Sequence, residues 1–174
     1  MTFALFETSI GTCGIAWSED GLARVQLPEG TPAAAAARLA RVSGGEPAAP
    51  PYPHAIATLI ADIQALLQGQ RIDFSSVTLD LARLPAFDRR VYDLTRAIPA
   101  GSTATYGDVA TKLGDVGLSR AVGQALGRNP IPIVIPCHRV VAAGGEIGGF
   151  SATGGAATKR RILDIESAQG TLPW

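Results

Sequence analysis

The 174-residue sequence contains few cysteines, few aromatic residues, no net charge and no long apolar run. No segment approaches the about 18 uninterrupted apolar residues that a membrane-spanning helix needs, and the first residues lack the basic start and apolar stretch of a secretory signal. The two cysteines, Cys13 and Cys137, are too few and too far apart to form a disulfide framework. We therefore expect a cytoplasmic protein, because a reducing compartment keeps thiols free.

The zero net charge argues against a strongly cationic nucleic-acid-binding protein, but the charges are unevenly distributed. Residues 1–84 carry five arginines and eight acidic residues, a balance of −3, whereas residues 85–174 carry ten basic and seven acidic residues, a balance of +3. A basic second half is compatible with DNA contact, of modest and salt-sensitive affinity.

The first half has the pattern of a small α/β domain. Three apolar runs, at residues 2–8, 12–18 and 21–27, are separated by turn residues and predict a three-stranded antiparallel meander, in which Cys13 is a core residue. Capped and periodic segments then predict helices at 31–42 and 53–68, with a final strand at 77–81 and His54 at the surface. Nothing in residues 1–84 indicates chemistry.

The second half has the pattern of a helix-turn-helix. After a helix at 86–97, residues 102–113 predict a capped helix, 114–117 a glycine-bearing turn, and 118–126 a second helix with Ser119 as N-cap. The second helix combines small residues with one long cation in its first turn, which suits close approach to a shallow minor groove. Close helix packing is the alternative explanation.

The segment 129–141 is apolar and contains three prolines, so it is a poor helix and a poor central strand. It predicts a stiff, extended approach to a tight turn that holds Cys137 next to His138 and Arg139. Because the thiolate is the nucleophile, chemistry at this cysteine needs a base or a positive charge nearby. A buried, inert cysteine is the alternative.

These motifs together resemble the 6-O-alkylguanine-DNA alkyltransferases (methylated-DNA–protein-cysteine methyltransferases). The resemblance covers about residues 85 to 167, and the matching segments are Tyr106-Gly107, Arg120-Ala-Val-Gly123, Asn129-Pro-Ile-Pro-Ile133, Pro136-Cys-His-Arg-Val140, Gly148-Gly-Phe150 and Lys159 through Glu166. It implies an α+β fold in which an α/β support domain (1–84) precedes a winged-helix-like domain (85–174) that binds DNA and accepts the alkyl group.

The resemblance also implies a set of catalytic residues. Cys137 takes the alkyl group once and permanently, after His138, acting through a bound water and oriented by Glu166, removes the thiol proton. Tyr106 presses on the backbone of the flipped nucleotide and hydrogen-bonds the guanine ring. Asn129 ties the second helix to the cysteine turn.

Further residues are implied to bind DNA or the base. Arg120 replaces the flipped nucleotide in the stack, with additional DNA contacts from Ala121, Gly123, Arg128 and Arg139. The implied base-binding residues are Phe150, Ser151 and Lys159. The link after Phe150 is two residues longer than is common in the family, which leaves the pocket size open.

The expected partner is double-stranded DNA that contains 6-O-alkylguanine, with 4-O-alkylthymine as a second candidate lesion, and we expect a monomer with no membrane partner. We expect no cofactor and no metal, because Cys13 and His54 alone cannot form a tetrahedral zinc site outside the cysteine motif. Two alternatives stay open: a non-catalytic binder or regulator that uses only the helix-turn-helix, and a Cys/His enzyme with another substrate.

Overall fold

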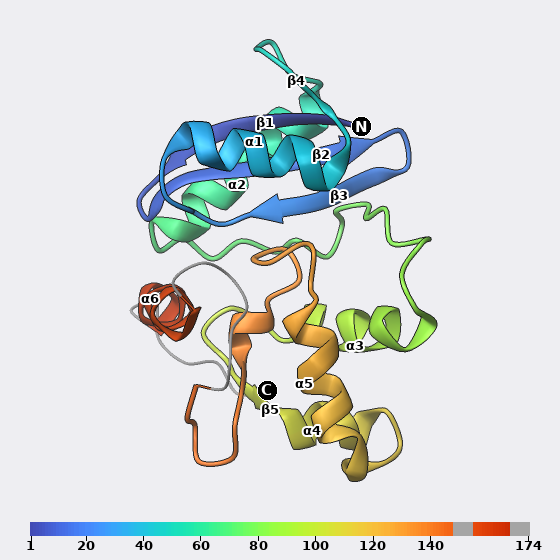
Figure 1. Cartoon of the computed structure of the whole chain (residues 1–174). Helices are drawn as coiled ribbons and strands as arrows, with labels where there is room; N and C mark the ends of the chain where they lie inside the picture. Colours follow the sequence, from blue (N-terminus) through green and yellow to red (C-terminus); the bar gives the residue numbers. More distant parts are fainter. Residues whose placement is uncertain (148–154, 168–174) are drawn as a thin grey trace.

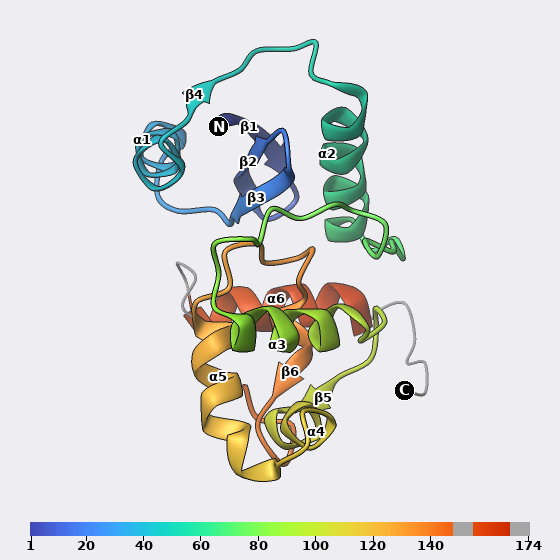
Figure 2. The same cartoon turned by 90° about the vertical axis from the view of Figure 1, so that its right-hand side faces the viewer.

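The computed structural model describes residues 1–147 and 155–167 (Figure 1). A β-sheet with one helix on each face forms one end of the molecule, and a group of helices forms the other (Figures 1 and 2). This is the expected α+β class. In the described part of the chain, none of the helices is long and apolar enough to cross a membrane.

The predicted meander is confirmed. Strands β1 (Thr2–Thr8), β2 (Gly11–Ser18) and β3 (Gly21–Gln26) pair antiparallel in order. A short strand that the sequence did not indicate, β4 (Glu46–Pro47), adds to β1 in parallel, so the sheet order is β3-β2-β1-β4.

The prediction of a strand at residues 77–81 is wrong. Only Leu79 forms a bridge, with Leu22 of β3. The pairing between β3 and residues 77–81 ends there. The next β3 amide that points away from β2, that of Val25, donates to the Pro130 carbonyl instead.

Two helices cover the sheet, as the sequence predicted. The helix α1 (Pro32–Ser43) begins at Thr31, whose hydroxyl accepts a hydrogen bond from the Ala34 amide at 3.2 Å. The helix α2 (His54–Leu67) buries an apolar stripe against the opposite face (Figure 2). His54 is exposed at its start and Cys13 is fully buried in β2, both as expected.

The helix-turn-helix is also present. It consists of α4 (Tyr106–Lys112), a short 3₁₀ turn η1 (Val116–Leu118) and α5 (Ser119–Gly127), which pack against α3 (Ala86–Arg96). Ser119 is not the N-cap, which corrects the prediction. It is already helical, and its hydroxyl donates to the Val116 carbonyl at 2.6 Å, because the 3₁₀ turn runs directly into α5.

A two-stranded parallel pair brings the cysteine turn to the helix-turn-helix. The strand β5 (Ala104–Thr105) precedes α4 directly and pairs with β6 (Val140–Val141), which follows the turn η2 (Cys137–Arg139). The last helix, α6 (Gly155–Ser167), packs against this turn. One continuous apolar cluster extends from the sheet through these elements, with members such as Ile15 and Ile135.

Candidate active site around Cys137

The cysteine turn has the stiff geometry that the prolines predicted. The Cys137 amide donates to the Ile135 carbonyl at 2.7 Å, and the Arg139 amide to the Pro136 carbonyl at 2.8 Å. Ile133, in the approach, has φ of +75°, a left-handed conformation that is strained for a β-branched residue. Packing and hydrogen bonds on both sides must therefore hold this segment in place.

Asn129 supplies one set of those bonds. Its Nδ2 donates to the Ile135 carbonyl at 2.9 Å, and its Oδ1 accepts from the Ile131 amide at 2.9 Å. Because Asn129 follows Arg128, the C-cap residue of α5, it joins that helix to the cysteine turn, as the resemblance implied.

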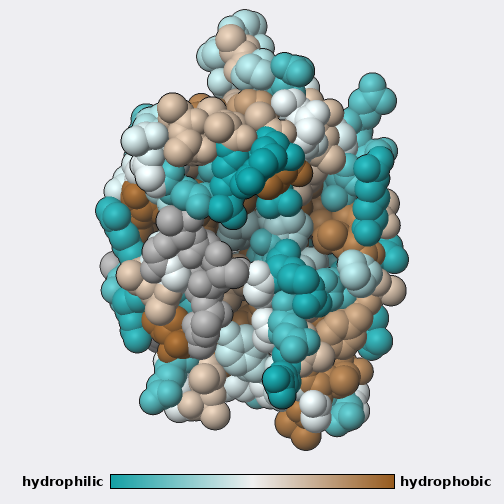
Figure 3. All heavy atoms as spheres, in the orientation of Figure 1, coloured by the Kyte–Doolittle hydropathy of each residue, from teal (hydrophilic) through white to brown (hydrophobic). Residues whose placement is uncertain are grey.

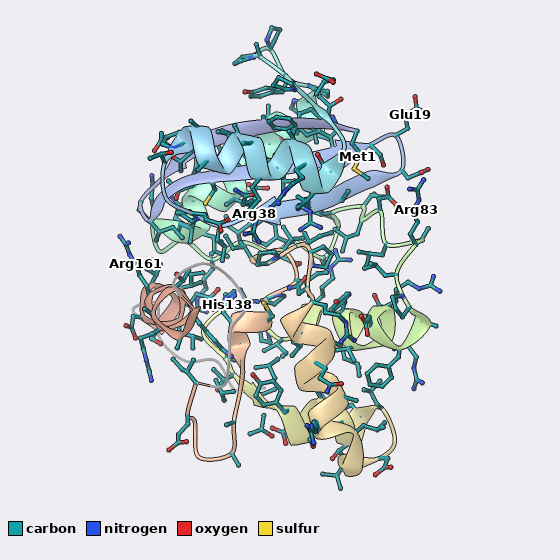
Figure 4. All side chains as sticks on the ribbon, viewed as in Figure 1. Met1, Glu19, Arg38, Arg83, His138 and Arg161 are labelled. Atoms are coloured by element: carbon teal, nitrogen blue, oxygen red, sulfur yellow. The ribbon has the colours of Figure 1, made fainter. Side chains whose placement is uncertain are left out.

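His138 and Arg139 of η2 form one buried network with Glu166 of α6. His138 is labelled in Figure 4, where it lies next to α6. His138 Nε2 lies 3.0 Å from Glu166 Oε1. Arg139 donates to both carboxylate oxygens, from Nη2 to Oε1 at 2.7 Å and from Nε to Oε2 at 3.0 Å, and its Nη1 donates to the Ile98 carbonyl at 2.6 Å.

The predicted DNA contact of Arg139 is therefore wrong. The residue is 5 % exposed, and its guanidinium is directed inward onto Glu166. A guanidinium in this forked arrangement binds a carboxylate at two points, so Arg139 holds Glu166 instead of a phosphate.

The charges in this network define the state of the imidazole. Burial alone would raise the pKa of Glu166, but the hydrogen bonds and positive charges of His138 and Arg139 outweigh it and lower the pKa to about 2. Burial lowers the pKa of His138 and outweighs the hydrogen bond and charge of Glu166, which raise it, while repulsion from Arg139 and Lys159 acts in the same direction as burial. A neutral His138 that donates Nε2–H to an ionised Glu166 keeps the lone pair on Nδ1.

That lone pair is available for a proton. Nδ1 of His138 is buried and has no hydrogen-bond partner within the described residues. In the same turn, Cys137 is 4 % exposed, and burial raises the pKa of its thiol, while a hydrogen bond from Asn129 and the charge of Lys159 act in the opposite direction. The sulfur is therefore a thiol at rest that needs a base to ionise.

Lys159, which the resemblance implies to be a base-binding residue, is buried. Its side chain is buried in α6, its ammonium donates to the Val140 carbonyl, and it lies 5.7 Å from the centroid of the Tyr106 ring. Burial lowers the pKa of Lys159, and the charge of Cys137 counteracts this. The structure thus places a buried cation near the sulfur, where it favours the thiolate.

Tyr106 connects this site to α5. It is half-buried at the start of α4, and a Cβ added at Gly123 of α5 would meet its ring at 3.7 Å. On α5, Ala121 and Gly123 are half-buried and small, whereas Arg120 is exposed. Hydrophilic and apolar residues are interspersed over the face seen in Figure 3.

Arg128, at the end of α5, has a partner that the sequence did not reveal. It donates to Asp88 of α3 from Nη2 at 2.9 Å and from Nε at 3.2 Å. The Arg128 side chain is still 58 % exposed, so its contact with DNA stays a prediction.

Two predicted base-binding residues, Phe150 and Ser151, lie outside the described residues. A cavity of about 460 Å³ lies behind the cysteine turn, between the end of α3 and residues 71–75, but Cys137 is not among its lining residues. Within residues 1–147 and 155–167, no group of three or more His, Cys, Asp or Glu side chains is arranged to hold a metal ion.

Comparisons with known proteins agree with this geometry. Residues 86–168 match the family model described as "6-O-methylguanine DNA methyltransferase, DNA binding domain". The methylated-DNA–protein-cysteine methyltransferase of Methanothermobacter thermautotrophicus is 37 % identical over 153 residues, which cover 88 % of this chain and 78 % of the relative. The enzyme of the same name from Mycobacterium tuberculosis H37Rv is 40 % identical over 119 residues, which cover 68 % of this chain and 70 % of the relative.

Solved structures of such proteins have the same fold. The crystal structure of Mycobacterium tuberculosis OGT in complex with DNA superposes with a TM-score of 0.79 at 30 % identity, covering 98 % of this chain and 96 % of that one. The 6-O-methylguanine-DNA methyltransferase of Pyrococcus kodakaraensis superposes with a TM-score of 0.72 at 26 % identity, covering 94 % and 98 %. With this likeness over nearly its whole length, and a buried cysteine, histidine and glutamate in one network, the chain belongs to the methylated-DNA–protein-cysteine methyltransferase family.

Proposed function

We propose that this protein repairs 6-O-alkylguanine in duplex DNA by transferring the alkyl group irreversibly to Sγ of Cys137. The observation that carries the assignment is the state of His138. Its Nε2 is committed to Glu166, its Nδ1 has no partner among the described residues, and it follows the thiol directly in a rigid turn. A base oriented by a carboxylate next to a thiol is the arrangement that activates a cysteine nucleophile.

The reaction consists of a proton transfer followed by an alkyl transfer. Nδ1 of His138 takes the Cys137 proton, through a bound water in the family arrangement, and Glu166 stabilises the imidazolium that forms. The thiolate attacks the alkyl carbon, a carbon–sulfur bond forms, and the bond from that carbon to the guanine oxygen breaks. The electron pair stays with guanine, whose negative charge the Tyr106 hydroxyl stabilises by a hydrogen bond, and the departing base finally takes up one proton, which equals the proton that left the thiol. A thioether is chemically stable, so each molecule acts once.

The residues around Cys137, His138 and Glu166 support the proton transfer and the thiolate. Arg139 keeps Glu166 ionised and correctly oriented, because it occupies both carboxylate oxygens. Lys159 lowers the cost of forming a thiolate in a buried site. Asn129 fixes the turn relative to α5, so the sulfur and the recognition helix keep one relative position.

Base extrusion is assigned to α5. An enzyme that acts on a base within a duplex has to move the base out of the stack. Ala121 and Gly123 allow α5 to approach a minor groove closely, and the exposed guanidinium of Arg120 is long and planar enough to stack where the base was. Arg128 supplies a further contact to the backbone, and Phe150 and Ser151 complete the base pocket.

We assign residues 1–84 to a support domain and residues 85–174 to DNA binding and alkyl transfer. Each site residue named above lies in the second range. We also place the protein in the cytoplasm as a monomer, because a nucleophilic thiol has to stay reduced until it meets DNA. Both cysteines are free in the structure.

Intact-protein mass spectrometry tests the proposal. The protein is mixed with a duplex that contains one 6-O-methylguanine, and we expect a single added methylene mass on every molecule. Cys137→Ser should gain no mass, and Cys13→Ser, which removes the other thiol, should gain the same mass as the wild type. DNA binding with no mass gain in the wild type would make the protein a non-catalytic binder and overturn the assignment.

A further inference from the structure

The outer edge of the N-terminal sheet, formed by β3, is covered by two segments. One is the linker around Thr78 and the other is the segment around Pro130. An uncovered edge strand exposes unpaired backbone groups. In β3, the Leu22 amide donates to the Thr78 carbonyl at 3.0 Å, and the Leu22 carbonyl accepts from the Asp80 amide at 2.9 Å. The Val25 amide donates to the Pro130 carbonyl at 3.0 Å. Pro130 belongs to the segment that leads to Cys137.

A β-bulge gives Val25 this orientation. Trp17 of β2 pairs with Leu22 and Ala16 pairs with Arg24, so Ala23 is an extra residue in β3. In a regular strand, outward-facing amides recur every second residue, whereas here they occur at Leu22 and then at Val25, three residues later. The bulge also places Leu22, Val25 and Leu27 together in the apolar cluster.

The segment that contains Pro130 is also held by the side chain of Asn129. Its side chain binds the Ile131 amide and the Ile135 carbonyl, while the Ile135 amide donates to the Ile131 carbonyl at 2.8 Å. Pro130 thus lies between two anchors, the sheet edge outside and the Asn129 bonds inside. The strained φ of Ile133, four residues before the cysteine, persists only if the surrounding contacts over-determine it.

We propose that Val25 is a positioning residue for alkyl transfer, acting through its backbone N–H, which anchors Pro130 and thereby holds Asn129 and Cys137 in their reactive arrangement. This inference rests on the proposed function and gives the N-terminal sheet a specific part in it. A shift of the turn by about 1 Å is enough to lower a rate about 100-fold in a well-aligned site.

The test compares Val25→Pro with Val25→Ala. Proline removes the N–H, and because this amide points away from β2, the ladder within the sheet keeps its bonds. Alanine removes more of the side chain than proline does but keeps the N–H, so it controls for lost packing. Reaction with the free alkylated base is followed by intact mass in single turnover, together with the thermal midpoint of each variant.

We expect Val25→Pro to react at least about tenfold more slowly than Val25→Ala. Its rate should also rise with pH through the range of an unassisted thiol, because a displaced sulfur loses the help of His138. A merely structural role would lower the thermal midpoint without changing the pH profile. Rates within twofold of each other and parallel pH profiles would overturn the inference.

Hydrogen exchange of the wild type decides the matter if the proline variant does not fold. The Val25 amide should be protected and should open together with the amides of Ile135 and Cys137, because one backbone unit holds all three. A Val25 amide that exchanges as fast as an unstructured peptide would refute the anchor. This measurement does not depend on activity, so it stands apart from a failure of the wild type to accept an alkyl group.

Discussion

Replacing Glu166 by glutamine should separate the two tasks of the buried network, stability and thiol activation. The fall in the pKa of Glu166 from 4.5 to about 2 corresponds to about 3 kcal/mol of preferential stabilisation of the carboxylate. Glutamine keeps a hydrogen-bond acceptor for His138 but leaves the Arg139 cation, which is 5 % exposed, without its counter-charge. Breaking a buried pair in this way costs about 3 to 5 kcal/mol.

The same substitution should also slow alkyl transfer. An imidazolium formed next to a neutral amide is less stable than one next to a carboxylate, and general-base catalysis contributes about 10²- to 10⁴-fold in rate. We expect a loss in that range at neutral pH, measured by single-turnover intact mass. Urea unfolding, followed by circular dichroism, measures the stability.

The double variant Arg139→Met/Glu166→Gln is the control that distinguishes the two effects. Without the Arg139 cation, the loss of Glu166 leaves no newly unpaired charge, so the unfolding free energy should recover most of the loss. The rate should stay low, because the carboxylate is still absent. If Glu166→Gln unfolds within about 1 kcal/mol of the wild type and reacts at the wild-type rate, the buried network has neither role.

The pH dependence of stability gives an independent check. Because the pKa of Glu166 is lowered by folding, its contribution is fully present above about pH 4.5 and is lost as the pH falls towards 2. The wild type should lose about 3 kcal/mol of unfolding free energy over this window from Glu166 alone, and Glu166→Gln should lack this component.

Two further predictions concern the general base His138 and the exposed Arg120. Because burial lowers the pKa of His138, the imidazole is neutral at and below the pH at which a free histidine titrates, so the alkyl-transfer rate should stay flat from pH 8 to about 6.5. A rate that falls steeply already between pH 8 and 7 would contradict a neutral resting histidine. Arg120→Ala should slow repair of the lesion in duplex DNA at least about tenfold, which corresponds to about 1.4 kcal/mol of lost stacking, yet leave reaction with the free base nearly unchanged. Equal losses on both substrates would exclude a role in flipping.

The elements themselves were predictable from the sequence, because their signals lie within a few residues. Asp20-Gly21 between apolar runs predicts a hairpin, and Thr31 before Pro32 predicts a helix start. Three prolines before Cys137 predict a stiff approach to a turn. The cysteine motif and its neighbours also indicated the family, which the comparisons bear out.

Only the tertiary structure decided which charges are buried and with which partners. Arg139 had the appearance of a DNA-contacting cation, but its partner Glu166 lies 27 residues further on, and packing of α6 on the turn brings them together. The Arg128–Asp88 pair and the Val25–Pro130 bond likewise join residues far apart in the chain. Periodicity and capping act locally, whereas desolvation of a charge and the orientation of an edge amide depend on what the folded chain places against them.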